Sequence, residues 1–391
     1  MALALLFLGQ LTIQANAFLP YISENGYEVV AVNTAPWYSP IRIEGTNIPV
    51  YNLYEGCNIS AGLKGQLGWF AKASLYSMAG NLKLKQQRLK QIIGNTGIDL
   101  IYGSWGSLSL PEIGIAREFQ IPAVYEFLTY PTTNIIVSQK IENFFNKRIV
   151  NNLNGRVLST QRMYSYMTKE FGIPQGENLV FMECYPEKFF YQKRLLPLST
   201  SDGQPHIVFI GMDVRDILPQ IEEVASRKIH VHICDMNQAG WNTNSLESFD
   251  SKNAFGNSEF IHPFNRFTYL EIANGSFATF LTQFDACLVT YDFWSASGLS
   301  RYNNSIPSRF SIAILAGIPI IIPKGYLNGC KEILEKYQIG FEYENYTDLR
   351  NKLSNKNMLT YFRGNATKNS KMLSLENNFK KMDKFLKSIV D

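Results

Sequence analysis

The chain has few cysteines and no long apolar run, and each absence excludes a class of protein. No stretch of about eighteen apolar residues occurs among the 391, so the sequence predicts no membrane-spanning helix. The five cysteines are scattered, without the paired spacing of zinc or redox motifs. Cys234 and Cys287 fall inside strand-like runs, where buried free thiols are expected. A repeat of about 20–50 residues, which would indicate a solenoid, is also missing.

Charged and imidazole side chains are sparse as well. Only 18% of the residues are charged and the net charge is +4, which argues against a dedicated nucleic-acid binder. A surface with this mild positive charge suits phosphorylated small molecules or anionic lipid better than it suits nucleic acid. The four histidines all lie in the second half, so the first half offers no imidazole base: His206, His230, His232 and His262. No clustered Asp and His signature indicates a metal, and we expect no metal cofactor.

The opening stretch, MALALLFLGQLTIQANAF, allows two interpretations. An apolar run that ends in Ala15-Asn16-Ala17 is typical of a secretory signal peptide with its cleavage site. The same letters fit a buried strand followed by a helix that begins near Thr12. A signal peptide carries a positive amino terminus, but the first basic residue here is Arg42. A helix stop at Gly26 and a second apolar strand follow, so we favour a βαβ unit that opens a doubly wound domain.

Strands and helices then alternate through two halves of the chain. Apolar runs without polar alternation are typical of parallel strands that are covered on both faces. They lie at 98–105, 121–127, 155–160 and 177–182 in the first half, and at 206–211, 228–235, 285–292 and 318–323 in the second. The segment 191–205 is rich in Pro, Ser, Gly and Asp and is expected to be a linker.

We therefore expect an α/β protein made of two Rossmann-like parallel-sheet domains that face a central cleft. The carboxyl ends of parallel strands are where such folds bind their ligands. The expected domains are 1–190 and 206–370, and the tail 371–391 is expected to form an amphipathic helix.

One segment predicts an anion site. A strand and a long polar loop are followed by Pro307-Ser308-Arg309, which opens a helix. Backbone N–H groups at a helix N-terminus attract anions, and a cation in the first turn is unfavourable unless it faces one. The Arg309 guanidinium could hold a diphosphate through two parallel hydrogen bonds. The alternative is an arginine that pairs with a nearby carboxylate.

At this segment the sequence resembles the GT-B glycosyltransferases, and more closely their family 4-like group. The shared pattern is a Pro-x-Lys/Arg helix start, a helix that ends in Ala-Gly, then x-Pro and an apolar strand. Here it consists of Pro307, Arg309, Ala316-Gly317, Ile318-Pro319 and IIIP. The resemblance extends along nearly the whole chain, and the tail helix resembles the one that crosses back to the first domain in that family.

The resemblance implies a nucleotide-sugar donor held mainly by the second domain, in a role such as polysaccharide biosynthesis. Its diphosphate would lie near Pro307, Ser308 and Arg309 and near the loop that follows Gly211, in which Arg215 matches a basic residue common in the family. His262 follows a strand and is expected either to approach the nucleotide or to be a satisfied structural histidine. Many retaining members have a ribose-binding Glu where this chain has Ile312, which cannot accept a hydrogen bond.

The acceptor is expected on the loops that end the strands of the first domain. The residues assigned to it are Gly9, Gln10, Trp105 and Tyr130. An inverting enzyme would need a carboxylate base, for which Glu126 is the candidate. A retaining enzyme of this fold is thought to use the departing phosphate as the base, with Arg309 supporting its charge. The missing imidazole base favours retention.

The stretch 62–93 mixes aromatic and basic residues. This composition suits a helix that lies on an anionic bilayer, and it equally suits a core helix with a solvated basic face. We expect a cytoplasmic hexosyltransferase. Contact with a bilayer would place it on the inner face of a membrane and would favour a lipid-linked acceptor. A glycan and a small molecule are the alternative acceptors. The rival functions are a non-catalytic sugar-binding or partner protein, which Ile312 favours, and a nucleotide-sugar epimerase.

Overall fold

The computed structural model describes residues 2–34, 42–53, 82–104, 110–131, 136–174, 176–211, 217–235, 258–264, 267–291 and 300–391. The chain forms two compact units. The first contains Met1–Met182 and Lys380–Asp391, and the second contains Glu183–Phe379. The last turns of the tail helix thus belong to the first unit.

The expected linker 191–205 lies inside the second unit. Its backbone is tied there by hydrogen bonds from Tyr191 N to Leu315 O (3.1 Å) and from Leu198 N to Gln283 O (2.9 Å). The segment also contains a short helix, α7 (Ser199–Asp202). Its Pro, Ser and Gly content therefore reflects a surface connection within the unit, and the change of unit comes earlier, at Met182 and Glu183.

The first unit is built on a seven-stranded parallel sheet with the order β3-β2-β1-β4-β5-β6-β7. The strands are β1 (Leu3–Gly9), β2 (Tyr27–Asn33), β3 (Val50–Asn52), β4 (Leu100–Ser104), β5 (Ala123–Phe127), β6 (Gly155–Leu158) and β7 (Asn178–Val180). Strand β1 pairs with β2 on one side and with β4 on the other. The strand interpretation of the opening stretch is therefore confirmed, and this strand is central to the sheet.

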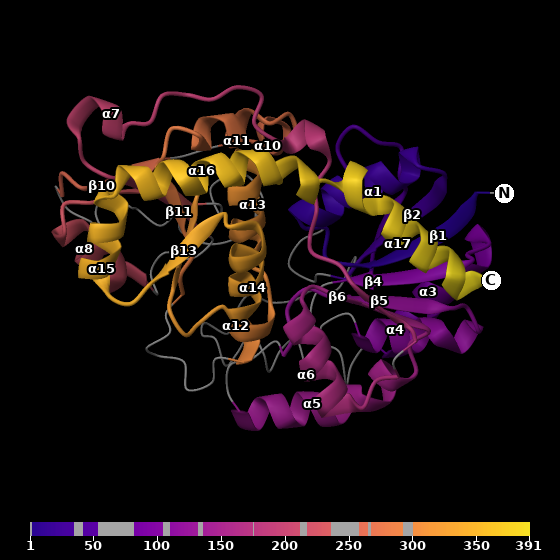
Figure 1. The fold of residues 1–391 in the computed structure, drawn as a ribbon. Coiled ribbons are helices and arrows are strands. Elements are labelled where there is room, and N and C mark those ends of the chain that lie inside the picture. Colours follow the sequence, from indigo (N-terminus) through magenta and orange to yellow (C-terminus); the bar gives the residue numbers. More distant parts are fainter. Residues whose placement is uncertain are drawn as a thin grey trace. The chain divides into compact units, whose positions relative to one another are not determined.

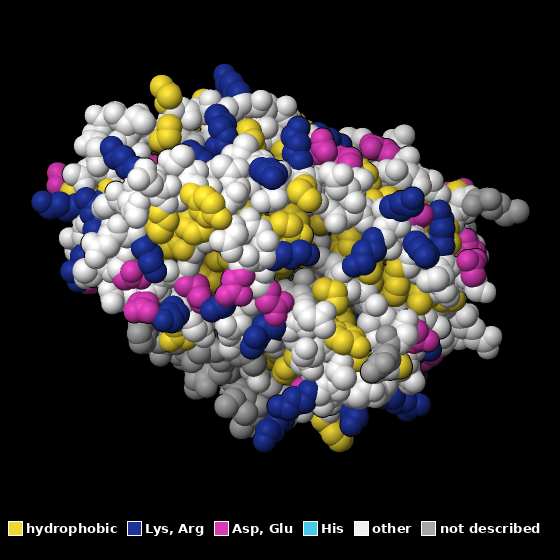
Figure 2. Space-filling model, viewed as in Figure 1, with side chains coloured by type: hydrophobic (Ala, Val, Ile, Leu, Met, Phe, Trp, Pro, Cys, Tyr) yellow, Lys and Arg dark blue, Asp and Glu magenta, His cyan; other side chains and the backbone are white. Residues whose placement is uncertain are grey.

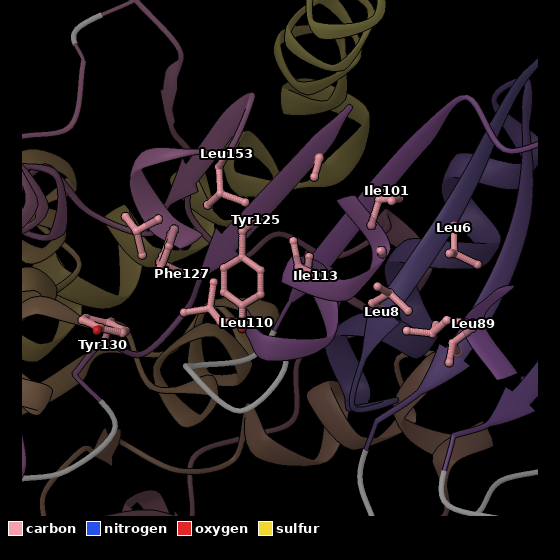
Figure 3. Packing of buried hydrophobic residues seen from close by; sticks show 14 of the residues in the cluster. Leu6, Leu8, Leu89, Ile101, Leu110, Ile113, Tyr125, Phe127, Tyr130 and Leu153 are labelled. Carbon is pink, nitrogen blue, oxygen red and sulfur yellow. The ribbon is translucent and has the colours of Figure 1, made fainter. Parts of the chain in front are cut away.

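Helices cover both faces of this sheet (Figure 1). One face carries α3 (Leu82–Thr96), α4 (Leu110–Ala116), α5 (Ile136–Asn151) and α6 (Gln161–Phe171), and the other carries α1 (Ile13–Glu24) and the end of α17 (Leu375–Val390). Side chains alternate along each strand, so Leu6, Leu8, Ile101 and Tyr125 enter the core cluster under α3–α6 (Figure 3). On the other face Phe18 of α1 packs on Tyr102, with ring centroids 5.7 Å apart.

The stretch 62–93 is described only from Leu82 onward, because 54–81 lie outside the described residues. In helix α3, Leu89, Ile92 and Ile93 are buried in the core cluster. This part is therefore a core helix with a polar outer face. No helix among the described residues is long and apolar enough to cross a bilayer.

The second unit has a six-stranded parallel sheet with the order β10-β9-β8-β11-β12-β13. Its strands are β8 (His206–Gly211), β9 (His230–Asp235), β10 (Ile261–Phe264), β11 (Ala286–Leu288), β12 (Ile320–Pro323) and β13 (Gly340–Tyr343). Its helices, besides α7, are α8 (Leu218–Ser226), α10 (Tyr269–Ala273), α11 (Ser276–Leu281), α12 (Ser300–Asn304), α13 (Ser308–Ala316), α14 (Asn328–Tyr337), α15 (Tyr346–Ser354) and α16 (Lys356–Ser370). The expectation of two parallel-sheet domains is confirmed, and Cys234 and Cys287 are buried free thiols as expected.

The surface agrees with the mild charge balance. On the face seen in Figure 2, Lys and Arg side chains are spread among acidic, polar and apolar ones instead of forming one basic stripe. A nucleic-acid-binding surface would gather them.

Candidate functional site

Arg309 lies at the carboxyl edge of the second sheet, in the first turn of α13. The helix begins at Ser308, and its N-cap residue is Pro307. No side chain forms a capping hydrogen bond. The Arg309 Nη1 donates to the Thr290 carbonyl oxygen at 3.0 Å. Its guanidinium carbon lies 4.7 Å from the centroid of the Phe209 ring and 4.5 Å from that of Tyr291. Aromatic faces and one carbonyl thus fix this half-buried cation.

No carboxylate of the described residues forms an ion pair with Arg309. The structural alternative of an arginine neutralised by a neighbouring acid is therefore not found within the described parts of the chain. Four of the five guanidinium N–H donors are not used by Thr290, and the first turn of α13, which carries Arg309, has no side-chain cap. The arrangement suits an anion with several oxygens.

Gly211, the last residue of β8, supports this arrangement by being small. A Cβ at this position would lie 2.5 Å from Cε1 of Phe209, whose ring stacks on Arg309. Any larger residue would displace that ring, so the glycine and the arginine are linked through Phe209. Tyr291, the second aromatic neighbour, is itself stacked on Tyr302 of α12 with 4.0 Å between centroids. Sequence reasoning missed the three aromatic residues, which come from separate elements.

The remaining donor-side predictions differ in outcome. Ser308 is exposed and Pro307 is partly exposed beside Arg309, whereas Arg215 lies outside the described residues. Ile312 is only 2% exposed and packs in the interior of the unit. This position therefore offers no side chain to a ribose.

His262 does not reach the carboxyl edge. Its Nε2 lies 2.8 Å from Nδ1 of His230, and its ring stacks 4.6 Å from that of His232. Burial, and next the neighbouring imidazoles, lower the pKa of His232 to about 3 and also lower the pKa values of His230 and His262. Of the two alternatives expected for His262, the structure favours the structural one, because its ring is held within a cluster of histidines.

Glu126 anchors a buried polar cluster at the carboxyl edge of the first sheet. Gln14 Nε2 donates to its Oε1 at 2.9 Å, and Ser104 Oγ donates to its Oε2 at 2.8 Å. Ser104 and Glu126 are direct partners in the β4–β5 register, and Gln14 lies in the first turn of α1. Glu126 is 4% exposed, and burial raises the pKa of its carboxyl group above the ordinary value despite these hydrogen bonds.

Tyr102 faces the same carboxyl group. Its hydroxyl is buried beside the Glu126 carboxyl group. Burial first, and the charge of Glu126 second, hold the pKa of this tyrosine well above 10. Tyr102 and Ser104 could have been found from the sequence, because they are two residues apart on one strand and so face the same side.

The other acceptor-side predictions also differ in outcome. Gly9 ends β1, where a Cβ would lie 2.8 Å from the Ser104 carbonyl oxygen, so only glycine fits. Gln10 is partly exposed, and Trp105 lies outside the described residues. Tyr130 is a core residue: it is 0% exposed, and its ring packs edge-on to Phe127 at 5.7 Å (Figure 3). The expected acceptor contact of Tyr130 is therefore wrong, because the chain turns this ring back under α5 and α6.

The two all-parallel sheets, each covered by helices, define the class: the chain has the two-Rossmann-like-domain fold of the GT-B glycosyltransferases. Similar solved structures include sucrose-phosphate synthase from Thermosynechococcus elongatus (TM-score 0.69, 11% identity, 99% of both chains covered). Others are Anabaena HepE in complex with UDP and glucose (TM-score 0.66, 13% identity, 98% of this chain and 99% of that one) and a glycosyltransferase from Rickettsia africae (TM-score 0.59, 12% identity, 100% and 99%). No family model and no curated protein sequence matches the chain. The expected GT-B resemblance is confirmed at the level of fold.

Proposed function

We propose that this protein is a glycosyltransferase that moves a sugar from a nucleoside-diphosphate donor to an acceptor, with retention of configuration. The observation that carries the proposal is Arg309, a half-buried cation at the N-terminus of α13 that has aromatic neighbours and no carboxylate partner among the described residues. A diphosphate has the charge and the oxygen geometry that this group can bind. Related structures of the same fold hold UDP and UDP-glucose, which makes a UDP-sugar the first donor to test.

The chemistry assigned to Arg309 is support of the leaving group. When the bond from the sugar to the diphosphate breaks, negative charge accumulates on the departing phosphate oxygens. A fixed guanidinium and the helix N-terminus stabilise that charge without reorganising. The same phosphate oxygen then accepts the proton of the acceptor hydroxyl, so no protein base is required.

Glu126 gives a second argument for retention. Both of its carboxyl oxygens already accept hydrogen bonds, and 4% exposure leaves little access for an acceptor hydroxyl. The inverting alternative requires Glu126 to act as base. We assign it a positioning role instead, holding Gln14 and Ser104 at the edge of the first sheet. The acceptor itself we leave as a glycan, a lipid-linked sugar or a small molecule.

The test is a titration of the full-length protein with UDP-, GDP-, dTDP- and ADP-sugars. Melting temperature and release of nucleoside diphosphate are followed in parallel. We expect one donor to stabilise the protein and to be hydrolysed slowly, and Arg309→Ala to require a higher donor concentration for stabilisation and to slow nucleotide release. Arg227→Ala is the matched control, because this arginine is exposed on the second unit and is paired with Glu223.

The rival functions give different results in the same assay. Stabilisation without any nucleotide release, with acceptors supplied, would support a non-catalytic sugar-binding protein. Conversion of the sugar while it stays attached to its nucleotide would support an epimerase. No response to any donor would overturn the proposal.

A further inference from the structure

All four histidines of the chain meet in one cluster at the amino half of the second sheet. His206 begins β8, His230 begins β9, and the two are direct register partners. His232 on β9 pairs with His262 on β10. Because residues two apart on a strand face the same side, all four rings lie on one face of the sheet. The centroids of neighbouring rings in this cluster are 4.3–5.2 Å apart.

Two of these rings direct the same type of atom at one carboxylate. The Nε2 of His206 lies 2.9 Å from Asp202 Oδ2, and the Nε2 of His230 lies 3.4 Å from the same oxygen. Donor atoms around a tetrahedral zinc ion lie about 3.3 Å apart, given metal–ligand distances of about 2.0–2.2 Å. All three atoms lie within 4.8 Å of one another, so the two stacked rings would have to tilt their Nε2 atoms together to bind one ion.

The other nitrogen of each ring is already held by a second histidine. His206 Nδ1 lies 2.9 Å from His232 Nε2, and His230 Nδ1 lies 2.8 Å from His262 Nε2. Metal-binding histidines usually donate their second ring N–H to an acceptor, which fixes the tautomer. Here the Nδ1–H groups of His206 and His230 can donate to His232 and His262. The two Nε2 lone pairs are then available to an ion, whereas without an ion the Nε2–H of His206 donates to Asp202.

Asp202 is suited to take part and to move. It lies on the short surface helix α7 with its side chain 38% exposed, whereas the side chains of His206 and His230 are 8% and 15% exposed. Its Oδ1 accepts the Gln204 backbone N–H at 2.9 Å, which leaves Oδ2 for the imidazoles. An ion could thus enter from the surface and be enclosed by the buried rings.

We propose that Asp202, His206 and His230 form a binding site for a divalent transition-metal ion of the zinc type, with His232 and His262 as the layer that fixes the tautomers. Two imidazole nitrogens and one carboxylate oxygen are a ligand set that zinc accepts, with water as the fourth ligand. The ion would join α7 to the amino ends of β8 and β9. The site is separate from Gly211, which ends β8, and so does not depend on the proposed transferase reaction.

The first test measures Zn²⁺ binding by titration calorimetry with full-length, tag-free, chelator-treated protein. We expect one ion per chain and a rise in melting temperature. Asp202→Asn should weaken binding by roughly tenfold or more, because it removes the anionic ligand on an exposed helix. His230→Gln should weaken it further. Glu335→Gln, which changes an exposed carboxylate of the same unit, should bind as the unchanged protein does.

The second test needs no variant. Because the chain contains only four histidines, ¹⁵N-histidine labelling reports on the cluster alone. We expect Zn²⁺ to change the Nε2 resonances of two imidazoles and the tautomers of the other two. Undisturbed histidine signals, no binding, or equal affinity in Asp202→Asn and in the unchanged protein would each overturn the proposal. The spectrum decides the question if His230→Gln fails to fold.

Discussion

Arg309 shows how the surroundings of one residue decide its role. An exposed arginine in the first turn of a helix is unfavourable to the helix dipole. In this protein the cost is offset by two aromatic faces and by the Thr290 carbonyl, which hold the charge in place. Within the described parts of the chain, Thr290 uses one of the five guanidinium N–H donors. The donor site proposed above rests on this arrangement.

Replacing Arg309 with alanine should therefore reduce donor affinity and leave the fold intact. Hydrogen bonds to charged groups contribute about 1.5–3 kcal/mol, so donor affinity should fall by roughly tenfold to a hundredfold. Arg309→Lys should recover only part of the loss, because an ammonium group cannot form two parallel bonds. Titration calorimetry with the donor measures the effect. An unchanged affinity would remove Arg309 from the donor site.

Glu126 makes a prediction about pH. Its pKa is raised in the folded state, so the folded protein holds this proton more tightly than the unfolded chain does. The resulting stability is complete below the unfolded value of about 4.5 and is lost as pH rises through the folded pKa. Glu126→Gln should remove this dependence. Urea unfolding from pH 4 to 8 should show the unchanged protein losing stability relative to the variant as pH rises, and parallel profiles would contradict the assignment.

Arg156 contributes to stability rather than to a site. It is 0% exposed, and its Nε and Nη2 donate to the Val150 carbonyl oxygen at 3.0 and 2.8 Å, with further bonds to Asn151 and Leu153. It thus satisfies the carbonyl groups that α5 leaves at its end. Arg156→Lys should cost about 2–4 kcal/mol of unfolding free energy, since several buried carbonyls lose their donors. Arg162→Lys is the control: Arg162 is exposed on α6, so this substitution should not change the unfolding free energy measurably.

At the scale of elements, burial separates residues that the sequence pattern treats alike. Phe127 on β5 is 0% exposed in the core cluster, whereas Phe144 on α5 is 77% exposed. Phe127→Ala should cost about 3–5 kcal/mol, because the cavity cannot close. Phe144→Ala should change the unfolding free energy by less than about 0.5 kcal/mol. Chemical denaturation of the two variants tests the core assigned here, and equal losses would show that α5 packs differently.

At the scale of the whole molecule, the sequence predicted what is encoded locally. Apolar runs and glycine stops indicated both parallel sheets, and the unusual arginine at a helix start led to the edge of the second sheet. Contacts set by register were not predictable. Asp202, His206, His230 and His262 come together because β8, β9 and β10 are neighbours in the sheet, with β9 in the middle. Their spacing along the chain shows no metal pattern. The predicted acceptor contact of Tyr130 was wrong for a related reason, because the side chain of an aromatic residue in a loop can turn either outward or into the core.

The tail helix is where the chain's two ends depend on each other. From Lys380 onward α17 belongs to the first unit. Tyr27 Oη donates to Asp383 at 2.8 Å, Lys381 Nζ donates to the Val180 carbonyl oxygen at 3.1 Å, and Phe385 lies over Gly155, where a Cβ would come within 2.9 Å of its ring. The residues from Lys380 onward thus cover one face of the sheet of the first unit.

Ending the chain after Phe379 should therefore destabilise the first unit selectively. The sheet would expose the face that Phe385 and Ile389 cover, and Tyr27 would lose its hydrogen bond to Asp383. Hydrogen exchange followed by mass spectrometry should show faster exchange in β2, β6 and β7, with β8 to β13 unchanged. Asp383→Asn, which weakens the Tyr27 hydrogen bond and removes the ion pair with Lys387, should show a small change confined to β2 and the end of α17. Equal loss of protection in both units would mean that they unfold together, and no loss would mean that the first sheet is stable without its last helix.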